Sequence, residues 1–321
     1  MVQAINEALH LAMSDDQSVI VLGEDVGTNG GVFRVTDGLK QKFGDMRVID
    51  TPLAESAIIG TAVGMSVNGL KPIAEIQFLG FIYEAMDQIV SQATRMRFRS
   101  SGRFHAPLVI RSPYGGNVNT PELHADSLEA IFSHSPGIKI VMPSSPYDAK
   151  GLLLAAIRDP DPVLFLEPMS IYRSIKEEVP DEIYYETIGE GKIVREGKDI
   201  TIVSWGPPIH FLKQLVDDFQ RKEIFIELID LRTVAPLDID LIVQSVEKTE
   251  RLIIVHEAVK TNGIGAEIAA LVAERAIFSL VAPILRVTGH DSPYPPGTLE
   301  KAWLPSKKRV EEAVLNILNF N

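Results

Sequence analysis

The sequence contains no cysteine among its 321 residues. A chain without cysteine cannot build a disulfide framework, a thiolate nucleophile, or a zinc or iron–sulfur site with cysteine ligands. Residues 1–9 also lack the basic and apolar regions of a signal peptide and the arginine-rich character of a transit peptide. Together these absences predict a mature cytoplasmic chain.

Positive charge is scarce, and no long hydrophobic run is free of charge. The chain has 31 lysine and arginine residues against 43 aspartate and glutamate residues, which gives a net charge of −12. A chain this acidic is not expected to bind nucleic acid through the phosphate backbone. The most apolar long stretch, 263–285, contains Glu267, Glu274 and Arg275, so it falls short of a membrane span. We therefore expect binding to neither nucleic acid nor membranes.

Two common signature motifs are also missing. The GxGxxG order of dinucleotide-binding loops does not occur, and no HExxH motif or histidine pair four residues apart is present. The sequence thus argues against a nicotinamide-dependent dehydrogenase and against a metal site with histidine ligands.

The residues that are present predict an α/β fold. Hydrophobic residues make up 45% of the chain and charged residues 23%, as in a folded chain with a large core. Short apolar runs rich in β-branched residues alternate with helix-length segments, which is typical of doubly wound parallel sheets. The expected strands are 19–22, 47–49, 73–76, 108–111, 139–142, 163–166, 200–204, 224–229, 252–256 and 284–287. The expected helices are 2–13, 55–67, 81–99, 147–158, 209–221, 239–247, 265–279 and 307–318.

A charged segment without periodicity, 176–182, contains Pro180 and is typical of a surface linker. We place the linker at 176–187. It would separate a first doubly wound domain, 1–175, from a second one, 188–321.

Two acidic residues follow expected strands, where ligands of open α/β sheets usually bind. Glu24 lies in the loop 23–31, whose glycines are a weak signal for phosphate because two carboxylates stand among them. An ordinary turn explains this loop equally well. Glu55 stands at the start of the apolar helix 55–67, where desolvation would favour a neutral carboxyl group able to share a proton with a ring nitrogen. The alternative is a first-turn acid that complements the helix dipole.

Aromatic residues and a histidine follow two further strands. The cluster 78–83 could stack on a flat heterocycle, although core packing is the alternative for most of its rings. The polar loop 112–126 contains His124, whose side chain suits proton transfer near neutral pH, unless it is a plain surface histidine. The segment 261–267, at the start of a helix, is a weak candidate for a small anion.

Five segments together resemble the beta subunit of the thiamin-diphosphate-dependent decarboxylating component of the 2-oxo acid dehydrogenases. They are 23–27, 50–55, 121–127, 146–151 and 230–238. The resemblance spans almost the whole chain. It implies a transketolase-like pyrimidine-binding domain followed by a transketolase C-terminal-like domain.

The same resemblance implies cofactors and partners. Thiamin diphosphate would lie at an alpha–beta contact in a heterotetramer of two alpha and two beta chains. The diphosphate and its Mg²⁺ would be held by the alpha subunit, because the GDG and NN signature for them is absent here. The chain alone would then be inactive. A lipoyl acyltransferase core protein is a further expected partner.

Four residues match functional positions of that family. Glu55 matches the glutamate that hydrogen-bonds the pyrimidine nitrogen, and Glu24 matches a second acid near it. Phe81 matches the aromatic residue that contacts the pyrimidine, and His124 matches the histidine facing the substrate or the lipoyl group. The resemblance therefore assigns Glu55 and His124 to catalysis and Glu24, Glu55 and Phe81 to the cofactor.

The resemblance says less about a structural K⁺ and about the substrate than about these four residues. The family often holds K⁺ through backbone carbonyls, and the matching segment here includes Ala156, Asp159 and Asp161. The run 167–173 slightly favours a branched-chain 2-oxo acid, with pyruvate next and acetoin dehydrogenases also similar. Another split transketolase-like enzyme and a non-catalytic scaffold subunit remain as alternatives.

Overall fold

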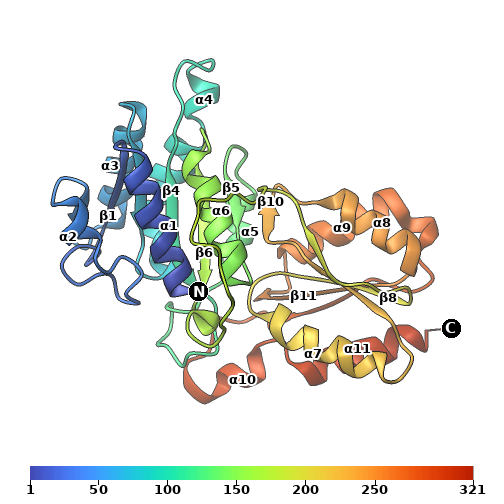
Figure 1. Cartoon of the computed structure of the whole chain (residues 1–321). Helices are drawn as coiled ribbons and strands as arrows, with labels where there is room; N and C mark the ends of the chain where they lie inside the picture. The colour runs from blue at the N-terminus through green and yellow to red at the C-terminus, as the bar shows by residue number, and fades with distance from the viewer. Residues whose placement is uncertain (321) are drawn as a thin grey trace.

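The computed structural model describes residues 1–320, which form two α/β units side by side (Figure 1). The first sheet has seven strands in the order β10-β5-β6-β4-β3-β1-β2. Its strands are β1 (Val19–Gly23), β2 (Val48–Asp50), β3 (Lys71–Glu75), β4 (Val109–Tyr114), β5 (Lys139–Val141), β6 (Val163–Pro168) and β10 (Thr233–Ala235). All of them run parallel except β10, which pairs antiparallel with β5. The first unit is therefore the doubly wound sheet that the alternating pattern predicted.

Helices cover both faces of this sheet (Figure 1). They are α1 (Val2–Asp15), α2 (Leu39–Phe43), α3 (Glu55–Val67), η1 (Leu79–Ala85), η2 (Asp87–Ala93), α4 (Met96–Arg99), α5 (Glu129–Ser133), α6 (Pro146–Arg158) and η3 (Met169–Ile171). Helices α1 and α6 pack together over one face, while α3, η1 and η2 share the apolar cluster on the other. Because both faces are covered, β1, β4 and β6 are buried along their whole length.

The second unit is a smaller sheet in the order β12-β11-β8-β9-β7. Its strands are β7 (Lys192–Arg195), β8 (Ile200–Ser204), β9 (Ile226–Asp230), β11 (Leu252–Val259) and β12 (Leu285–Gly289). Its helices are α7 (Pro208–Gln220), α8 (Ile239–Thr249), α9 (Ile264–Ala276), η4 (Ile277–Ser279), η5 (Gly297–Leu299), α10 (Glu300–Trp303) and α11 (Lys307–Leu318). Within the described part of the chain, no helix is both long and apolar enough to cross a membrane.

One predicted helix was wrong. The segment 81–99 is not a single α-helix but a 3₁₀ turn, a π-helical turn and the short α4. The buried residues Ile82, Ala85, Ile89 and Ala93 are three or four positions apart, so they carry the apolar spacing of an α-helix. The hydrogen-bond pattern changes along this segment while that spacing is kept. Apolar spacing alone therefore cannot distinguish one continuous α-helix from a succession of 3₁₀, π and α turns.

The two units share a strand and a core. Strand β10 belongs to the second half of the chain but pairs with β5 at the edge of the first sheet, with Thr233 opposite Val141. One apolar cluster contains Leu128 and Phe132 from the first unit together with Val234 and Ile242 from beyond the linker. Packing across both units therefore fixes their relative position.

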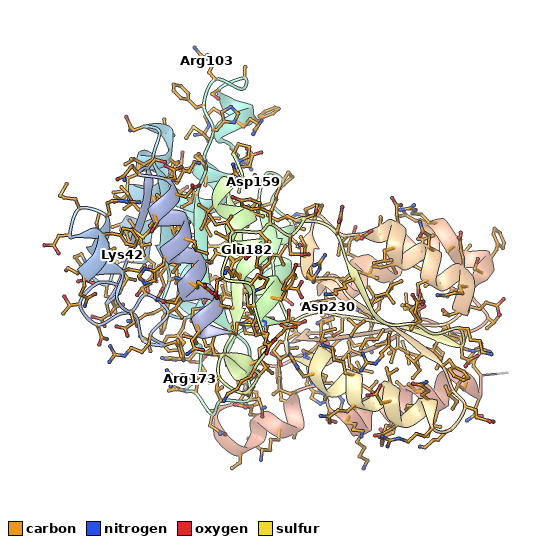
Figure 2. The ribbon with its side chains drawn as sticks, viewed as in Figure 1. Lys42, Arg103, Asp159, Arg173, Glu182 and Asp230 are labelled. Atoms are coloured by element: carbon orange, nitrogen blue, oxygen red, sulfur yellow. The ribbon has the colours of Figure 1, made fainter. Side chains whose placement is uncertain are left out.

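Buried carboxyl groups gather where the two units meet. They belong to Glu129 of α5, to Asp230 at the end of β9 and to Glu257 of β11, none more than 8% exposed. Asp230 lies between the two units in the view of Figure 2 and accepts a hydrogen bond from Ser144. Burial raises the pKa of each of these three carboxyl groups to about 7. Each group thus stays protonated in the folded chain at a pH where it would ionise in water.

This cluster predicts that the contact between the units weakens as the pH rises. The pKa of Glu129 is about 7 in the fold against a reference value of 4.5, so its stabilising effect is complete below 4.5 and lost as the pH rises through 7. Between about pH 6 and pH 8, wild type should lose about 1 kcal/mol more unfolding free energy than Glu129→Gln. Urea unfolding at both pH values measures the difference. The exposed acid variant Glu182→Gln serves as the control, and an equal loss in wild type and Glu129→Gln would contradict the prediction.

Candidate functional site

The residues singled out in the sequence converge on one edge of the first sheet. Strands β4, β3, β1 and β2 are adjacent and parallel, so their carboxyl ends lie together. Glu24 directly follows β1, and α3 begins at Glu55 after β2. The turn η1 with Phe81 follows β3, and the loop with His124 follows β4. This edge is where open α/β sheets bind their ligands.

Glu55 is held in an apolar setting by its own helix. The side chains of Ile58, Ile59 and Ala62 on α3 pack into the core, which places Glu55 at the sheet edge with 8% of its surface exposed. Glu24 is half-buried, and its pKa is raised by burial and by the charges of Asp25 and Glu55. The charge of Glu55 therefore acts on Glu24, so the two acids lie near each other at this edge.

His124 packs against aromatic rings and is half-buried. Its imidazole lies 4.6 Å from the ring of Phe78 and 5.1 Å from that of Phe81, measured between centroids. Its Nδ1 is 2.9 Å from the backbone oxygen of Glu122. A Cβ on Gly80 would stand 1.9 Å from the carbonyl oxygen of Leu123, so the close approach of the histidine loop requires glycine there.

The segment matched to a structural K⁺ lies elsewhere. Ala156 is near the end of α6, and Asp159 and Asp161 precede the amino end of β6, on the opposite edge of the sheet. Both carboxyl oxygens of Asp159 accept hydrogen bonds of 2.6 Å from Lys139, and Asp161 pairs with Arg97 at 2.7 Å. The side chains of Asp159 and Asp161 thus already pair with lysine and arginine. Only backbone carbonyls would be available to bind K⁺. In residues 1–320 no cluster of three or more histidine or acidic side chains could hold a metal. A K⁺ site here stays a prediction.

A buried ionic network beneath the site escaped sequence analysis. Arg111 at the centre of the sheet is 1% exposed and donates to Glu75 at 2.7 Å and to Glu167 at 2.6 and 2.9 Å. The hydroxyl of Tyr172 donates to Glu167 at 2.5 Å. Burial works against the arginine charge, but the charges of Glu167 and Glu75 hold the pKa of Arg111 above its usual value. Glu75 ends β3, three residues before Phe78, so this network supports the strand that positions the aromatic cluster.

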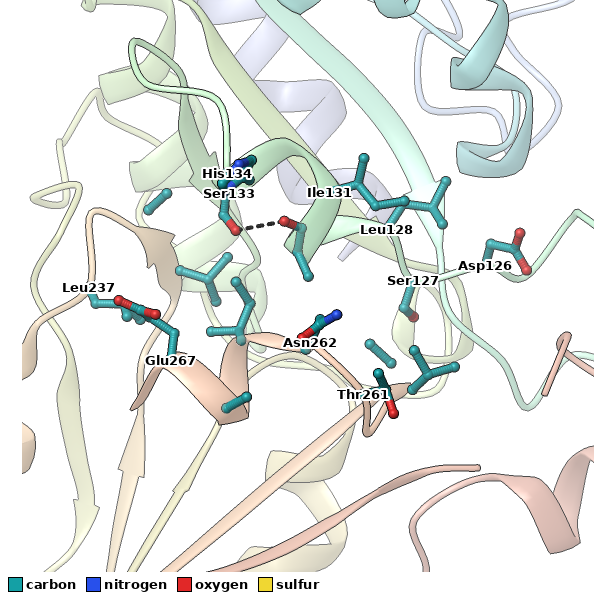
Figure 3. A pocket seen from close by; sticks show the side chains of 18 of the residues that line it. Asp126, Ser127, Leu128, Ile131, Ser133, His134, Leu237, Thr261, Asn262 and Glu267 are labelled. Carbon is teal, nitrogen blue, oxygen red and sulfur yellow. Dashed lines mark hydrogen bonds between the residues drawn. The ribbon is translucent and has the colours of Figure 1, made fainter. Parts of the chain in front are cut away.

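A cavity of about 1190 Å³ lies between the two units beside the histidine loop (Figure 3). Asp126 and Ser127 line it from the first unit, and Asn262 and Glu267 line it from the start of α9. Burial raises the pKa of Asp126, with a further contribution from the charge of Glu122. The segment 261–267 therefore faces a cavity with carboxyl groups on two sides, which does not favour the small anion considered for it.

Comparison with known proteins places the chain in a family. Residues 1–174 match the family "Transketolase, pyrimidine binding domain" and residues 189–310 match "Transketolase, C-terminal domain". The chain is 53% identical over 320 residues to the pyruvate dehydrogenase E1 component subunit beta of Bacillus subtilis, covering 100% of this chain and 98% of that protein. The same subunit of Staphylococcus aureus is 52% identical with the same coverage.

A solved structure agrees with the predicted fold. A split gene transketolase, described as an inactive beta4 tetramer, superposes with a TM-score of 0.81 at 21% identity, covering 98% of this chain and 97% of the other. The predicted transketolase-like architecture is confirmed, and so is the predicted family. By the extent and identity of these matches, the chain belongs to the family of E1 beta subunits of the 2-oxo acid dehydrogenases.

Proposed function

We propose that this chain supplies the pyrimidine-binding half of a thiamin diphosphate site, in a heterotetramer of two alpha and two beta chains. The observation that carries the proposal is the convergence of Glu24, Glu55, Phe81 and His124 on one sheet edge. Their chemistry fits an aminopyrimidine: a carboxyl group for a ring nitrogen, aromatic surface for a flat ring, and an imidazole beside it. The diphosphate and Mg²⁺ would be held by the alpha subunit.

The side chains have distinct roles in this proposal. Thiamin diphosphate, when bound, supplies the electron sink for decarboxylation of a 2-oxo acid. Glu55 holds a proton at its carboxyl oxygen and exchanges it with the pyrimidine nitrogen. Glu24, whose pKa is raised by burial and by the charges of Asp25 and Glu55, would be a second polar group beside the ring. Phe81 limits the space in which the ring can lie.

His124 would serve the substrate side of the reaction. Its Nδ1 lies 2.9 Å from the carbonyl oxygen of Glu122, which can only accept a hydrogen bond. This partner favours the tautomer with the proton on Nδ1 and leaves Nε2 free to take up a proton and pass it to the substrate or to a sulfur of the incoming lipoyl disulfide. The imidazole would thereby hold or move a proton at Nε2.

We rank pyruvate first as the substrate. The sequence alone slightly favoured a branched-chain 2-oxo acid, but both relatives reported above are named pyruvate dehydrogenase subunits. An acyl group would then pass to a lipoyl domain of an acyltransferase core. One extra branch in an apolar pocket changes specificity by only about 10- to 200-fold, so turnover of both substrate types is compatible with one site.

The test is co-expression of this chain with its alpha subunit, followed by assay of decarboxylation with thiamin diphosphate and Mg²⁺. We expect activity only in the mixture, with pyruvate preferred over 3-methyl-2-oxobutanoate and 4-methyl-2-oxopentanoate, and acylation of an added lipoyl domain. Activity of this chain alone would contradict the shared site. Ketol transfer without lipoyl acylation would favour a split transketolase, and a complex unable to bind thiamin diphosphate would favour a scaffold.

A further inference from the structure

The loop that carries His124 is anchored on the second unit as well as on the first. The amide of Gly116 donates to Oε2 of Glu257 at 3.3 Å, and the amide of Asn119 donates to Oε2 of Glu300 at 3.0 Å. Glu257 belongs to β11 and Glu300 begins α10, so both acceptors come from the far side of the linker. They are 8% and 1% exposed, respectively. Water competes poorly for such shielded carboxyl groups, so these hydrogen bonds are persistent.

The fit of this loop against the second unit is close. A Cβ on Gly115, whose φ is +83°, would stand 2.6 Å from Oε2 of Glu257. A Cβ on Gly116 would stand 2.0 Å from the hydroxyl of Tyr294, which packs edge-on against Trp303 at 4.9 Å. A side chain at either glycine would displace the Glu257 carboxyl group or the Tyr294 ring.

The backbone from the first anchor to His124 is not relaxed. Asn117, Asn119 and Leu123 have φ values of 65°, 54° and 66°, a left-handed conformation that residues with side chains adopt at a cost. Beyond Asn119 the chain reaches Leu123, whose carbonyl contacts Gly80, and His124 follows directly. A loop in this conformation would change shape if its contacts to the second unit were released.

We propose that Glu300 and Glu257 are positioning residues, through which the second unit sets the place of His124 at the sheet edge. The inference rests on the proposed function of His124 and adds to it a role for the second unit in the chemistry. The charges of Glu129 and Glu300 act on Glu257, Glu257 acts in turn on Tyr114 and Tyr294, and Tyr294 lies beside Glu300. Neither acid touches the reacting atoms; each acts through the loop backbone.

A double-mutant cycle in the alpha–beta complex tests this role. Glu300→Ala should lower kcat/KM for lipoyl acylation about tenfold, the effect expected from loss of one buried hydrogen bond, without changing thiamin diphosphate affinity. Glu300→Gln keeps an acceptor oxygen and should restore most of the activity. In a His124→Ala background, Glu300→Ala should have no further effect, because its action passes through the histidine. Glu312→Ala, an exposed acid of the same unit, is the control.

Hydrogen exchange of residues 115–124 gives an independent readout. Exchange should be about tenfold faster in Glu300→Ala than in wild type or Glu312→Ala, since the Asn119 amide loses its acceptor. Should Glu300→Ala fail to assemble, Glu257→Met decides, because it removes the acceptor of Gly116 and fills the site with an apolar side chain of similar size.

The outcomes separate this inference from the proposed function. Unchanged exchange of the loop, or effects of Glu300→Ala and His124→Ala that multiply, would overturn the positioning role. A normal Glu300→Ala complex beside an impaired His124→Ala complex would overturn only this inference. Full activity of His124→Ala would instead contradict the proposed role of the histidine and, with it, the reason for positioning it.

Discussion

Glu55→Gln should lower 2-oxo acid decarboxylation by the alpha–beta complex on the order of a thousandfold, the range of a lost acid–base group. Glutamine is close in size to glutamate and can still donate to a ring nitrogen, but it cannot take up or release a proton near neutral pH. Thiamin diphosphate binding and assembly of the complex should therefore survive. Decarboxylation rates and calorimetric titration with thiamin diphosphate measure the two effects separately.

The control for Glu55 comes from the second unit. Glu267 is a first-turn acid of α9, just as Glu55 is of α3, but it is exposed. If Glu55 only complemented the helix dipole, Glu55→Gln and Glu267→Gln would each reduce stability by at most about 1 kcal/mol and leave turnover unchanged. Equal activity of the two variants would thus reject the catalytic role of Glu55.

Arg111→Met should reduce the free energy of unfolding by about 3–5 kcal/mol, because it leaves two buried carboxylates without their cation. Arg111 donates to Glu75 at 2.7 Å and to Glu167 at 2.6 and 2.9 Å, and both acids are almost fully buried. Arg111→Lys should rescue little, since an ammonium group cannot form the paired bonds of a guanidinium to Glu167. Urea unfolding followed by circular dichroism measures the loss.

Arg97 offers a matched comparison on the surface. It pairs with Asp161 at 2.7 Å, a distance like those of Arg111, but the two side chains are 44% and 29% exposed. Arg97→Met should therefore change stability by less than about 1 kcal/mol. A loss for Arg111→Met no greater than that for Arg97→Met would show that the buried network contributes little to the fold.

Much of the fold follows from local patterns. The strand β4 is buried on both faces of a parallel sheet, and the apolar run 106–110 leads into it, so its existence could be predicted without knowledge of its neighbours. The helix α3 and its first residue, Glu55, were predicted because the polar segment 50–54 interrupts two apolar ones. Adjacent parallel strands then suffice to bring Glu24 and Glu55 to one edge.

Other features depend on contacts between distant residues, which leave no periodic signal. The three residues of β10 are too few to carry a pattern, and their place beside β5 is decided by packing across the linker. Arg111 forms ion pairs with Glu75 and Glu167, which are 36 and 56 residues away along the chain.

The sequence by itself determined the α/β class and the family and predicted residues for acid–base chemistry, because each rests on composition, local periodicity or a short motif. Only the tertiary structure decided that Arg111 balances two buried acids, that aromatic rings hold His124, and that Glu300 reaches its loop from 181 residues away. The physical reason is that hydrogen bonds and ion pairs form between side chains that folding brings together, whatever their distance along the chain.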